Sequence, residues 1–395
     1  MKFLLIMILS IVSLPFLATA SSQTADSTTD QLLETRDTPL LDSQEISDPR
    51  VKIIDFGGRA TSGIVNEKTN TVYVTDFYAG KLHIIDGHTD EVIESIKVIK
   101  TPFGVGINPE TDMIYVGGEF ANILLVINAV TKQVESEIPL KDPYDIAVNP
   151  TNNMIYVTSD RSDSVYVIDG KTNQVVTSFE VLVPCGIAVN PATGMVYVTS
   201  ESENLVHVYD GNTNEMVTTI NVEESPRGVT VNPITNLVYV TNQESNSVSV
   251  IDGSSNESID SIPAGELPRR IVVNPQTNTI YVSNQGSKDI SVIDGSNNKI
   301  IETIQVAEPF ELALNSKTNK LYAMYIGSKL SVISNNPEIL QPSGSPLKQI
   351  SSGVEASSIV CNRNFELIFK ASDNSPACVK PPTAEKLIQR GWARE

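Results

Sequence analysis

Seven tyrosines recur at a nearly constant spacing along the chain, each inside a short run of aliphatic residues. They are Tyr73, Tyr115, Tyr156, Tyr197, Tyr239, Tyr281 and Tyr322, so successive tyrosines are 42, 41, 41, 42, 42 and 41 residues apart. An interval of about 40 residues is typical of one four-stranded propeller blade, which must stack on neighbours to bury both faces. The spacing therefore predicts an all-β fold, a seven-bladed β-propeller of four-stranded blades.

The unit around Tyr239 shows how the strands are delimited. Short apolar segments at 228–231, 237–241 and 247–251 predict its first three strands, and a fourth ends near Ile262. Turns of the Asn-Pro-x-Thr-Asn and Asp-Gly types separate them. The last residue of the first turn is always of a type that tolerates a left-handed backbone: Asn70, Asp112, Asn153, Gly194, Asn236, Asn278 and Asn319.

The two ends of the repeat region predict how the ring closes. The segment from Val51 to Gly57 has the pattern of a fourth strand and precedes the first unit at the usual distance. The seventh unit supplies only three strands, up to about Ser334. We therefore predict that the N-terminal strand completes the last blade, within a propeller that covers residues 50–342. A strand from Glu338 to Gln341 is the alternative closing piece.

The repeat has a specific resemblance. Tyr239-Val240-Thr241-Asn242, with Val-Asn-Pro-x-Thr-Asn and Val-Ile-Asp-Gly signatures around it, resembles the YVTN-family β-propeller repeats of archaeal and bacterial surface proteins. The likeness covers about residues 51–335 and implies a secreted or surface-layer-associated propeller. The wider superfamily also holds lactonase-like and quinoprotein-like enzymes, so the resemblance specifies the fold more closely than the function.

The N-terminus indicates export. Lys2, an apolar run from Phe3 to Leu17 and Ala18-Thr19-Ala20 have the order of a secretory signal peptide over residues 1–20. An uncleaved membrane anchor is the alternative. Residues 21–49, rich in Ser, Thr and Asp, predict a flexible leader. No second apolar run of membrane-spanning length follows, so we expect a secreted, extracellular protein associated with the cell envelope.

Charge excludes one class of partner. The chain has 47 acidic and 28 basic residues, a formal net charge of −19. A nucleic-acid-binding protein needs a basic face to neutralise phosphates, so no nucleic acid is expected as a partner. The expected partners are a protein, an envelope polymer or a small anionic ligand.

Residues 343–395 break the repeat and predict a small C-terminal module. In an exported protein, Cys361 and Cys378 predict a disulfide that staples a small hairpin. A helix is expected to start near Pro381 with Thr383 as its N-cap and to end at Gly391. The segment from Ser375 to Trp392 resembles a C-terminal module of exported proteins from ammonia-oxidising archaea, which implies an archaeal source. A cap on the propeller and an attachment module both remain open.

A binding site is expected where a position repeats but its residue type varies. In propellers, the loops that join strand four to the next strand one, and strand two to strand three, surround one mouth of the central channel. The residues after the repeat proline, or after Ala60 in the first unit, are Thr61, Phe103, Tyr144, Cys185, Arg227, Arg269 and Phe310, followed by Ser62, Gly104, Asp145, Gly186, Gly228, Arg270 and Glu311. The third residue after each tyrosine also varies: Asp76, Gly118, Ser159, Ser200, Asn242, Asn284 and Tyr325.

Three arginines of this set, Arg227, Arg269 and Arg270, fall on consecutive units of an acidic chain. Guanidinium groups bind carboxylates and phosphates through paired hydrogen bonds, which predicts an anionic ligand or an acidic partner loop at the mouth. The other candidate ligand-binding residues are Tyr144, Asp145, Phe103, Phe310, Glu311, Asn242 and Asn284. The alternative is a structural ion-pair network in which Glu311 and Asp145 neutralise the arginines.

The sequence has few residues that could bind a metal or carry out catalysis. Three histidines and three cysteines do not predict a metal cluster, and His83 and His207 belong to nearly opposite blades. No Ser/His/Asp constellation is evident, so no catalytic residue, metal or cofactor is expected. Cys185 is the unpaired thiol, either a small buried residue or a reactive group. Asn256, in an Asn-Glu-Ser sequon, is a possible glycosylation site.

The first functional hypothesis is a non-enzymatic binding scaffold with its ligand or partner at the arginine-containing mouth. The second is a lactonase-like or quinoprotein-like enzyme in which Arg227 or Arg269 polarises an oxyanion and Asp145 or Glu311 acts as base. The third is a structural surface-layer component. The sequence names no ligand for any of them.

Overall fold

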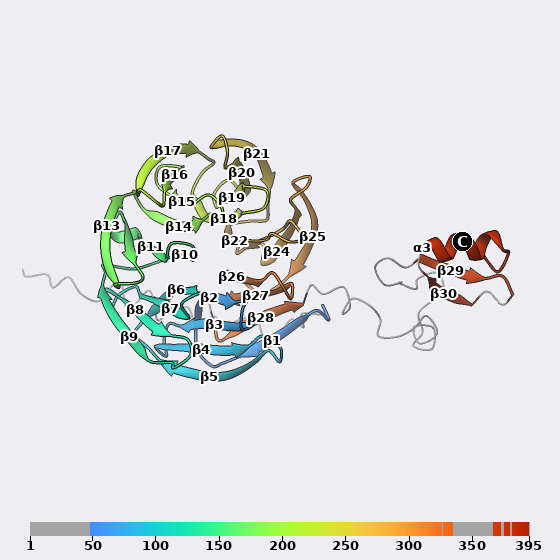
Figure 1. Ribbon diagram of the computed structural model, residues 1–395, viewed down its shortest axis with the longest axis horizontal. Coiled ribbons are helices and arrows are strands. Elements are labelled where there is room, and N and C mark those ends of the chain that lie inside the picture. The colour runs from blue at the N-terminus through green and yellow to red at the C-terminus, as the bar shows by residue number, and fades with distance from the viewer. Residues whose placement is uncertain (1–47, 326, 335–365, 373–374, 380, 395) are drawn as a thin grey trace, which may run out of the picture. The chain divides into compact units, whose positions relative to one another are not determined.

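A computed structural model describes residues 48–325, 327–334, 366–372, 375–379 and 381–394. Residues 48–334 form seven antiparallel sheets of four strands each, arranged as blades around a central axis (Figure 1). The predicted seven-bladed, all-β propeller is confirmed.

The four strands of each blade follow one another outward from the axis (Figure 1). The first strands are β2 (Ala60–Asn66), β6 (Pro102–Asn108), β10 (Ile146–Asn149), β14 (Pro184–Val189), β18 (Pro226–Asn232), β22 (Pro268–Asn274) and β26 (Pro309–Asn315). The second strands are β3 (Thr71–Asp76), β7 (Met113–Gly118), β11 (Met154–Ser159), β15 (Met195–Ser200), β19 (Leu237–Asn242), β23 (Thr279–Asn284) and β27 (Lys320–Tyr325). The third strands are β4 (Lys81–Asp86), β8 (Ile123–Asn128), β12 (Ser164–Asp169), β16 (Leu205–Asp210), β20 (Ser247–Asp252), β24 (Asp289–Asp294) and β28 (Lys329–Ser334). The fourth strands are β5 (Glu91–Lys97), β9 (Val134–Pro139), β13 (Gln174–Glu180), β17 (Glu215–Asn221), β21 (Glu257–Pro263), β25 (Lys299–Gln305) and β1 (Val51–Asp55).

The ring closes through the N-terminal strand, as predicted. β1 pairs antiparallel with β28, so that Ile54 lies opposite Leu330, and blade 7 takes its fourth strand from the start of the repeat region. First strands β26 and β2, at the two ends of the repeat, lie in contact. The alternative closing strand, Glu338–Gln341, falls outside the described residues.

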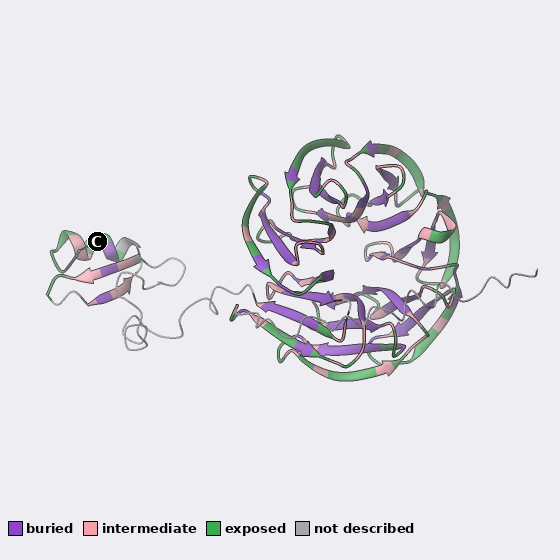
Figure 2. Cartoon of the chain, turned by 180° about the vertical axis from the view of Figure 1, so that it is seen from behind, coloured by how far each residue is buried: buried purple, intermediate pink, exposed green. Residues whose placement is uncertain are grey.

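Hydrophobic layers between neighbouring blades hold the ring together. Tyr197, Val206 and Val208 of blade 4 pack against Val238 and Val240 of blade 5, and all five are buried. The same arrangement recurs around the ring, with the inner three strands buried and the fourth strands largely exposed (Figure 2). The repeat tyrosines are therefore core residues that fill the space between blades, which explains their constant spacing.

The Asn-Pro turns add a polar clasp between blades. The buried asparagine that ends a first strand donates a hydrogen bond to the left-handed turn asparagine of the next blade, with N···O distances of 2.6–2.8 Å: Asn108 to Asn153, Asn190 to Asn236, Asn232 to Asn278, Asn274 to Asn319 and Asn315 to Asn70. The last pair joins blade 7 to blade 1. The predicted left-handed turn positions are confirmed, with φ from +52° to +79°.

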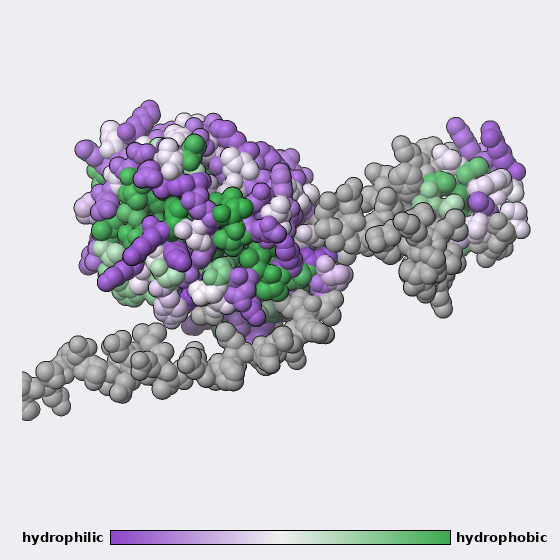
Figure 3. Space-filling view, turned by 90° about the horizontal axis from the view of Figure 1, so that it is seen from below, coloured by the Kyte–Doolittle hydropathy of each residue, from purple (hydrophilic) through white to green (hydrophobic). Residues whose placement is uncertain are grey.

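The fourth strands face outward and carry exposed β-branched residues beside charged ones, including Ile93, Val176, Ile259 and Ile301. Hydrophobic patches are visible on the rim of the ring (Figure 3). As each fourth strand is a sheet edge, the interspersed charges keep these edges from pairing with other chains.

The C-terminal residues form a small unit of their own. Strands β30 (Pro376–Val379), β29 (Glu366–Lys370) and β31 (Ala393–Arg394) form a sheet in that order, with α3 (Pro381–Gln389) beside it. Ile368, Ala384 and Ala393 make its buried core. The helix begins two residues before Thr383, so that residue is not the N-cap; proline is well suited to the first helical turn because its missing N–H needs no partner there.

Several predictions concern residues outside the described ranges. Residues 1–20 and the leader up to residue 47 are among them, so the signal peptide stays a prediction. Cys361 is also outside these ranges, so the Cys361–Cys378 disulfide stays a prediction. Within the described part of the chain, no helix has both the length and the apolar character needed to cross a membrane.

Candidate functional site

The varied residues lie at one end of the central channel because each first strand begins there. In an antiparallel blade, the loops between strands two and three and between strands four and one emerge at the same end, which we call the mouth face. Six of the seven first strands have a register irregularity just after their first residue, for example between Pro226 and Val229. A bulge places two residues opposite one and redirects their side chains. Arg227 and Arg269 occupy such bulges.

In blades 1, 3, 4 and 5, a threonine of the second strand binds the backbone at the start of the first strand. The Thr241 hydroxyl accepts a hydrogen bond from the Gly228 N–H at 2.8 Å and donates one to the carbonyl oxygen of Arg269, in the next blade, at 3.0 Å. The equivalent hydroxyls of Thr75, Thr158 and Thr199 donate to the carbonyls of Phe103, Cys185 and Arg227 at 2.8–3.1 Å. The repeated Thr of the Tyr-Val-Thr motif thus holds the backbone of the variable ring, a role that the sequence analysis missed although the motif carried the signal.

Arg270 joins three blades across the channel. Its Nη1 donates to Asp145 Oδ2 of blade 3 at 2.8 Å, and its Nε donates to Glu311 Oε2 of blade 7 at 2.7 Å. The Arg270 side chain is 13% exposed. Three of the other six blades have glycine at this second bulge position, where a Cβ on Gly186 would lie 2.4 Å from the Arg227 carbonyl oxygen. The three charged residues therefore form a network that bridges the channel, which matches the ion-pair alternative for this one arginine.

Glu311 is the surplus carboxylate of that network. Burial raises its pKa to about 7, against the opposing attraction of Arg270 and with added repulsion from Asp145. Its Oε1 accepts a hydrogen bond from the Leu312 N–H at 3.2 Å. One guanidinium shared between the buried Glu311 and the partly buried Asp145 cannot fully stabilise both charges, so the buried carboxylate titrates near neutral pH.

Arg269 has a different environment. Its guanidinium carbon lies 3.9 Å from the centre of the Phe310 ring, and its Nη2 donates to the Tyr144 hydroxyl at 3.3 Å. Among the described residues, no carboxylate lies within ion-pair distance of it. Its pKa is lowered, first by burial and then by repulsion from Arg270 and Arg227. Within the described part of the chain, this cation is thus held in place without a counter-ion.

An aromatic cluster supports Arg269. Phe103 stacks on Tyr144 with ring centres 4.7 Å apart, and it meets Phe310 edge-to-face at 6.2 Å. Phe103 and Phe310 are buried, and Tyr144 is partly buried. These rings come from blades 2, 3 and 7, so ring closure is what brings them to the arginine of blade 6. Stacking on Phe310 fixes the orientation of the guanidinium plane.

Arg227 is neutralised at the edge of the channel. Its Nη2 donates to Glu201 at 2.5 Å and its Nε to Gln243 at 2.8 Å. Cys185 lies beside this pair, with its Sγ 3.4 Å from Glu201 and 3.8 Å from Arg227 Nη1. Burial raises the pKa of the Cys185 thiol to about 12, so the group is protonated at neutral pH. This environment favours the interpretation of Cys185 as a small buried residue, since nucleophilic thiols need a lowered pKa.

Asn242 and Asn284 do not belong to this cluster. Both are fully buried inside their own blades. The Asn242 amide donates to Ser247 and Ser249 at 3.0 and 2.9 Å, and the Asn284 amide donates to Asp289 and Ser291 at 2.7 and 2.8 Å. In these two blades the last residue of the second strand thus points between strands, so Asn242 and Asn284 are removed from the candidate ligand set.

The structure also assembles a constellation that the sequence analysis did not find. His83 lies between the Asp76 carboxylate, with Nε2 3.2 Å from Oδ2, and the Ser95 hydroxyl, 2.7 Å from Nδ1. The same register in blade 5 holds Asn242 and Ser249, so we interpret this group as a blade-stiffening network. His207 of blade 4 pairs separately with Glu203 at 2.9 Å. Across the described ranges, no group of three His, Cys, Asp or Glu side chains is placed to hold a metal ion.

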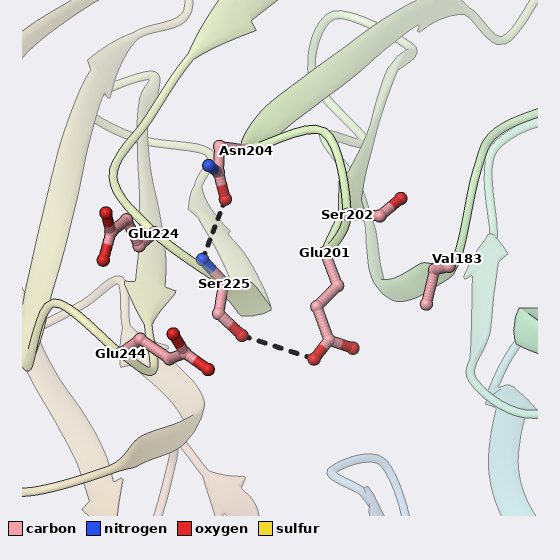
Figure 4. Close-up of a pocket in the computed structure, with 7 residues that line it drawn as sticks. All are labelled: Val183, Glu201, Ser202, Asn204, Glu224, Ser225 and Glu244. Atoms are coloured by element: carbon pink, nitrogen blue, oxygen red, sulfur yellow. Dashed lines mark hydrogen bonds between the residues drawn. The ribbon is translucent and has the colours of Figure 1, made fainter.

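A shallow acidic pocket opens in the mouth face beside Arg227. It has a volume of about 510 Å³ and is lined by Val183, Glu201, Ser202, Asn204, Glu224, Ser225 and Glu244, from the loops of blades 4 and 5 (Figure 4). Ser225 joins two of its walls: its hydroxyl donates to Glu201 at 3.3 Å, and its N–H donates to Asn204 Oδ1 at 3.0 Å. The sequon residue Asn256 lies elsewhere, in the turn between β20 and β21, with φ of +57°.

Comparison with known proteins supports the fold. No family model matches the sequence, and no curated protein matches it. Among solved structures, the chain is similar to hydrazine synthase of Kuenenia stuttgartiensis, with a TM-score of 0.64 and 15% sequence identity over 71% of this chain and 96% of that one. At this identity the likeness concerns the fold alone.

Proposed function

We propose that this protein is a non-enzymatic binding scaffold that takes a small anion, of the carboxylate class, at Arg269. The observation that carries the proposal is a guanidinium stacked on Phe310 and hydrogen-bonded to Tyr144, with no carboxylate of the described residues beside it. A fixed, partly desolvated cation gains more from an anion than a solvated one does. Arg227 and Arg270 already have partners and take a supporting role.

The experiment is a titration of the full chain with acetate, benzoate and inorganic phosphate, followed by calorimetry and thermal shift. Wild type is expected to bind benzoate most tightly, because the aromatic cluster adds a stacking surface, and Arg269→Gln is expected to lose at least tenfold in affinity. Lys288→Gln is the control, since Lys288 is an exposed cation on the same blade and face, paired with Glu308 at 3.0 Å. Equal affinities in wild type and Arg269→Gln would exclude this site.

The enzymatic alternative has less support. Asp145 and Glu311, its proposed bases, both bind Arg270, so neither carboxylate is available beside Arg269. Secretion, the YVTN family and a place in the cell envelope belong to the same proposal and rest on the sequence. Edman sequencing of the exported protein would test the cleavage after Ala20.

A further inference from the structure

Three neighbouring hairpins of the mouth face carry a ladder of stacked side chains. Phe77 and Tyr78 of blade 1 meet edge-to-face with ring centres 5.5 Å apart, and Phe77 meets Phe120 of blade 2 at 6.3 Å. Arg59 lies over Phe77 and Tyr78 at 5.1 and 5.4 Å, and Arg161 of blade 3 lies over Phe120 at 4.5 Å. We call these five residues the aromatic ladder.

The fold does not require these aromatic residues. Tyr78 is 71% exposed and Phe120 53%, so neither is needed to fill a core. At the same hairpin position the other four blades have Ser202, Glu244, Gly286 and Gly327. Large aromatic and arginine side chains, clustered and exposed, are the composition of interface hot spots.

The other half of the same face is acidic. The loops of blades 4 to 6 carry six glutamates: Glu201, Glu203, Glu223, Glu224, Glu244 and Glu266. Glu224 and Glu244 line the acidic pocket (Figure 4). On the ladder itself Arg161 is already paired with Glu119 at 3.1 Å, so its charge does not call for an acidic partner. With a net charge of −19, the whole molecule attracts basic proteins.

We propose that the mouth face is the docking surface for a basic protein partner, which packs an apolar side chain on the aromatic ladder and sets Lys or Arg side chains over the glutamates of blades 4 to 6. The ladder supplies the contacts that slow dissociation, and the glutamates speed association and set orientation. The ladder and these glutamates do not include Arg269, and the proposal does not depend on the channel binding an anion.

The probe is a library of random dodecapeptides displayed on phage, selected against the full chain and measured as synthetic peptides by biolayer interferometry. Selected peptides are expected to be net basic with an aliphatic or aromatic residue. The double variant Tyr78→Ser with Phe120→Ser should weaken their binding at least tenfold, mainly through faster dissociation. The control is Ile234→Ser, because Ile234 is 63% exposed but lies in the turn between β18 and β19, on the opposite face.

A second variant tests the charge half of the proposal. Glu224→Gln with Glu244→Gln should slow association about threefold or more and flatten its dependence on salt between 50 and 300 mM, with little change in dissociation. Three results would overturn the proposal: selected peptides that are acidic, peptide binding that is unchanged in the Tyr78→Ser, Phe120→Ser double variant, or no enrichment of any peptide. A fourth result would also overturn it: light scattering that shows a wild-type dimer and a monomeric Tyr78→Ser, Phe120→Ser variant. The surface would then bind a second copy of the chain.

Discussion

The channel-bridging network makes a strong prediction about Arg270→Met. The substitution keeps most of the side-chain volume but leaves the buried Glu311 and the partly buried Asp145 without their cation. Removing one partner from a buried ion pair costs about 3–5 kcal/mol. At about 2 °C per kcal/mol for a domain of this size, the melting temperature should fall by about 8 °C at pH 7.5.

The matched control is Arg227→Met. Arg227 and Glu201 are also an ion pair, but their side chains are 25% and 26% exposed, and such a pair contributes about 0–1 kcal/mol. Urea denaturation of both variants, followed by far-UV circular dichroism, gives the free energy of unfolding. The two losses should differ by about 3 kcal/mol.

The effect of pH separates this explanation from a packing defect. Without Arg270, Glu311 loses an attraction that opposes the effect of burial, so its folded-state pKa lies further above the unfolded one. The penalty for burying this carboxylate is present at high pH and disappears as the pH falls through the folded value. The loss in Arg270→Met should therefore shrink between pH 7.5 and pH 5. A loss that is the same at both pH values, or no larger than that of Arg227→Met, would refute the ion-pair account.

Three further outcomes are expected. In wild type, Glu311 contributes stability that is complete below about pH 4.5 and is lost as the pH rises through its folded pKa of about 7. The free energy of unfolding should change by about 3 kcal/mol over this range. Glu311→Gln should remove that change from the pH profile of urea unfolding. Asn315→Ala removes the clasp to Asn70 that joins blades 7 and 1, and should cost about 2 kcal/mol in the same assay, against no loss for a substitution at exposed Ile301. Thr241→Val removes the bulge hydroxyl, so it should cost about 1–2 kcal/mol and also weaken benzoate binding at Arg269; unchanged binding would separate the bulge from the site.

Local patterns along the chain were enough for the scaffold. The tyrosine period predicted seven blades, the turn residues predicted left-handed positions such as Asn236, and the strand at Val51–Asp55 was assigned to the last blade. These features depend on a residue and its near neighbours, repeated seven times, so each copy strengthens the interpretation of the others.

The partners of the channel residues depend on the closed ring. Arg270 and Asp145 are 125 residues apart and meet only because blades 3 and 6 face each other across the axis. Side-chain direction at bulges and strand ends decides which arginine has no carboxylate beside it. It also decides which asparagines turn inward, as Asn242 does. One residue of register reverses that direction, and no one-dimensional pattern records it. The sequence by itself therefore determined the ring and the positions of its variable residues, whereas the tertiary structure decided which of their charges neutralise one another.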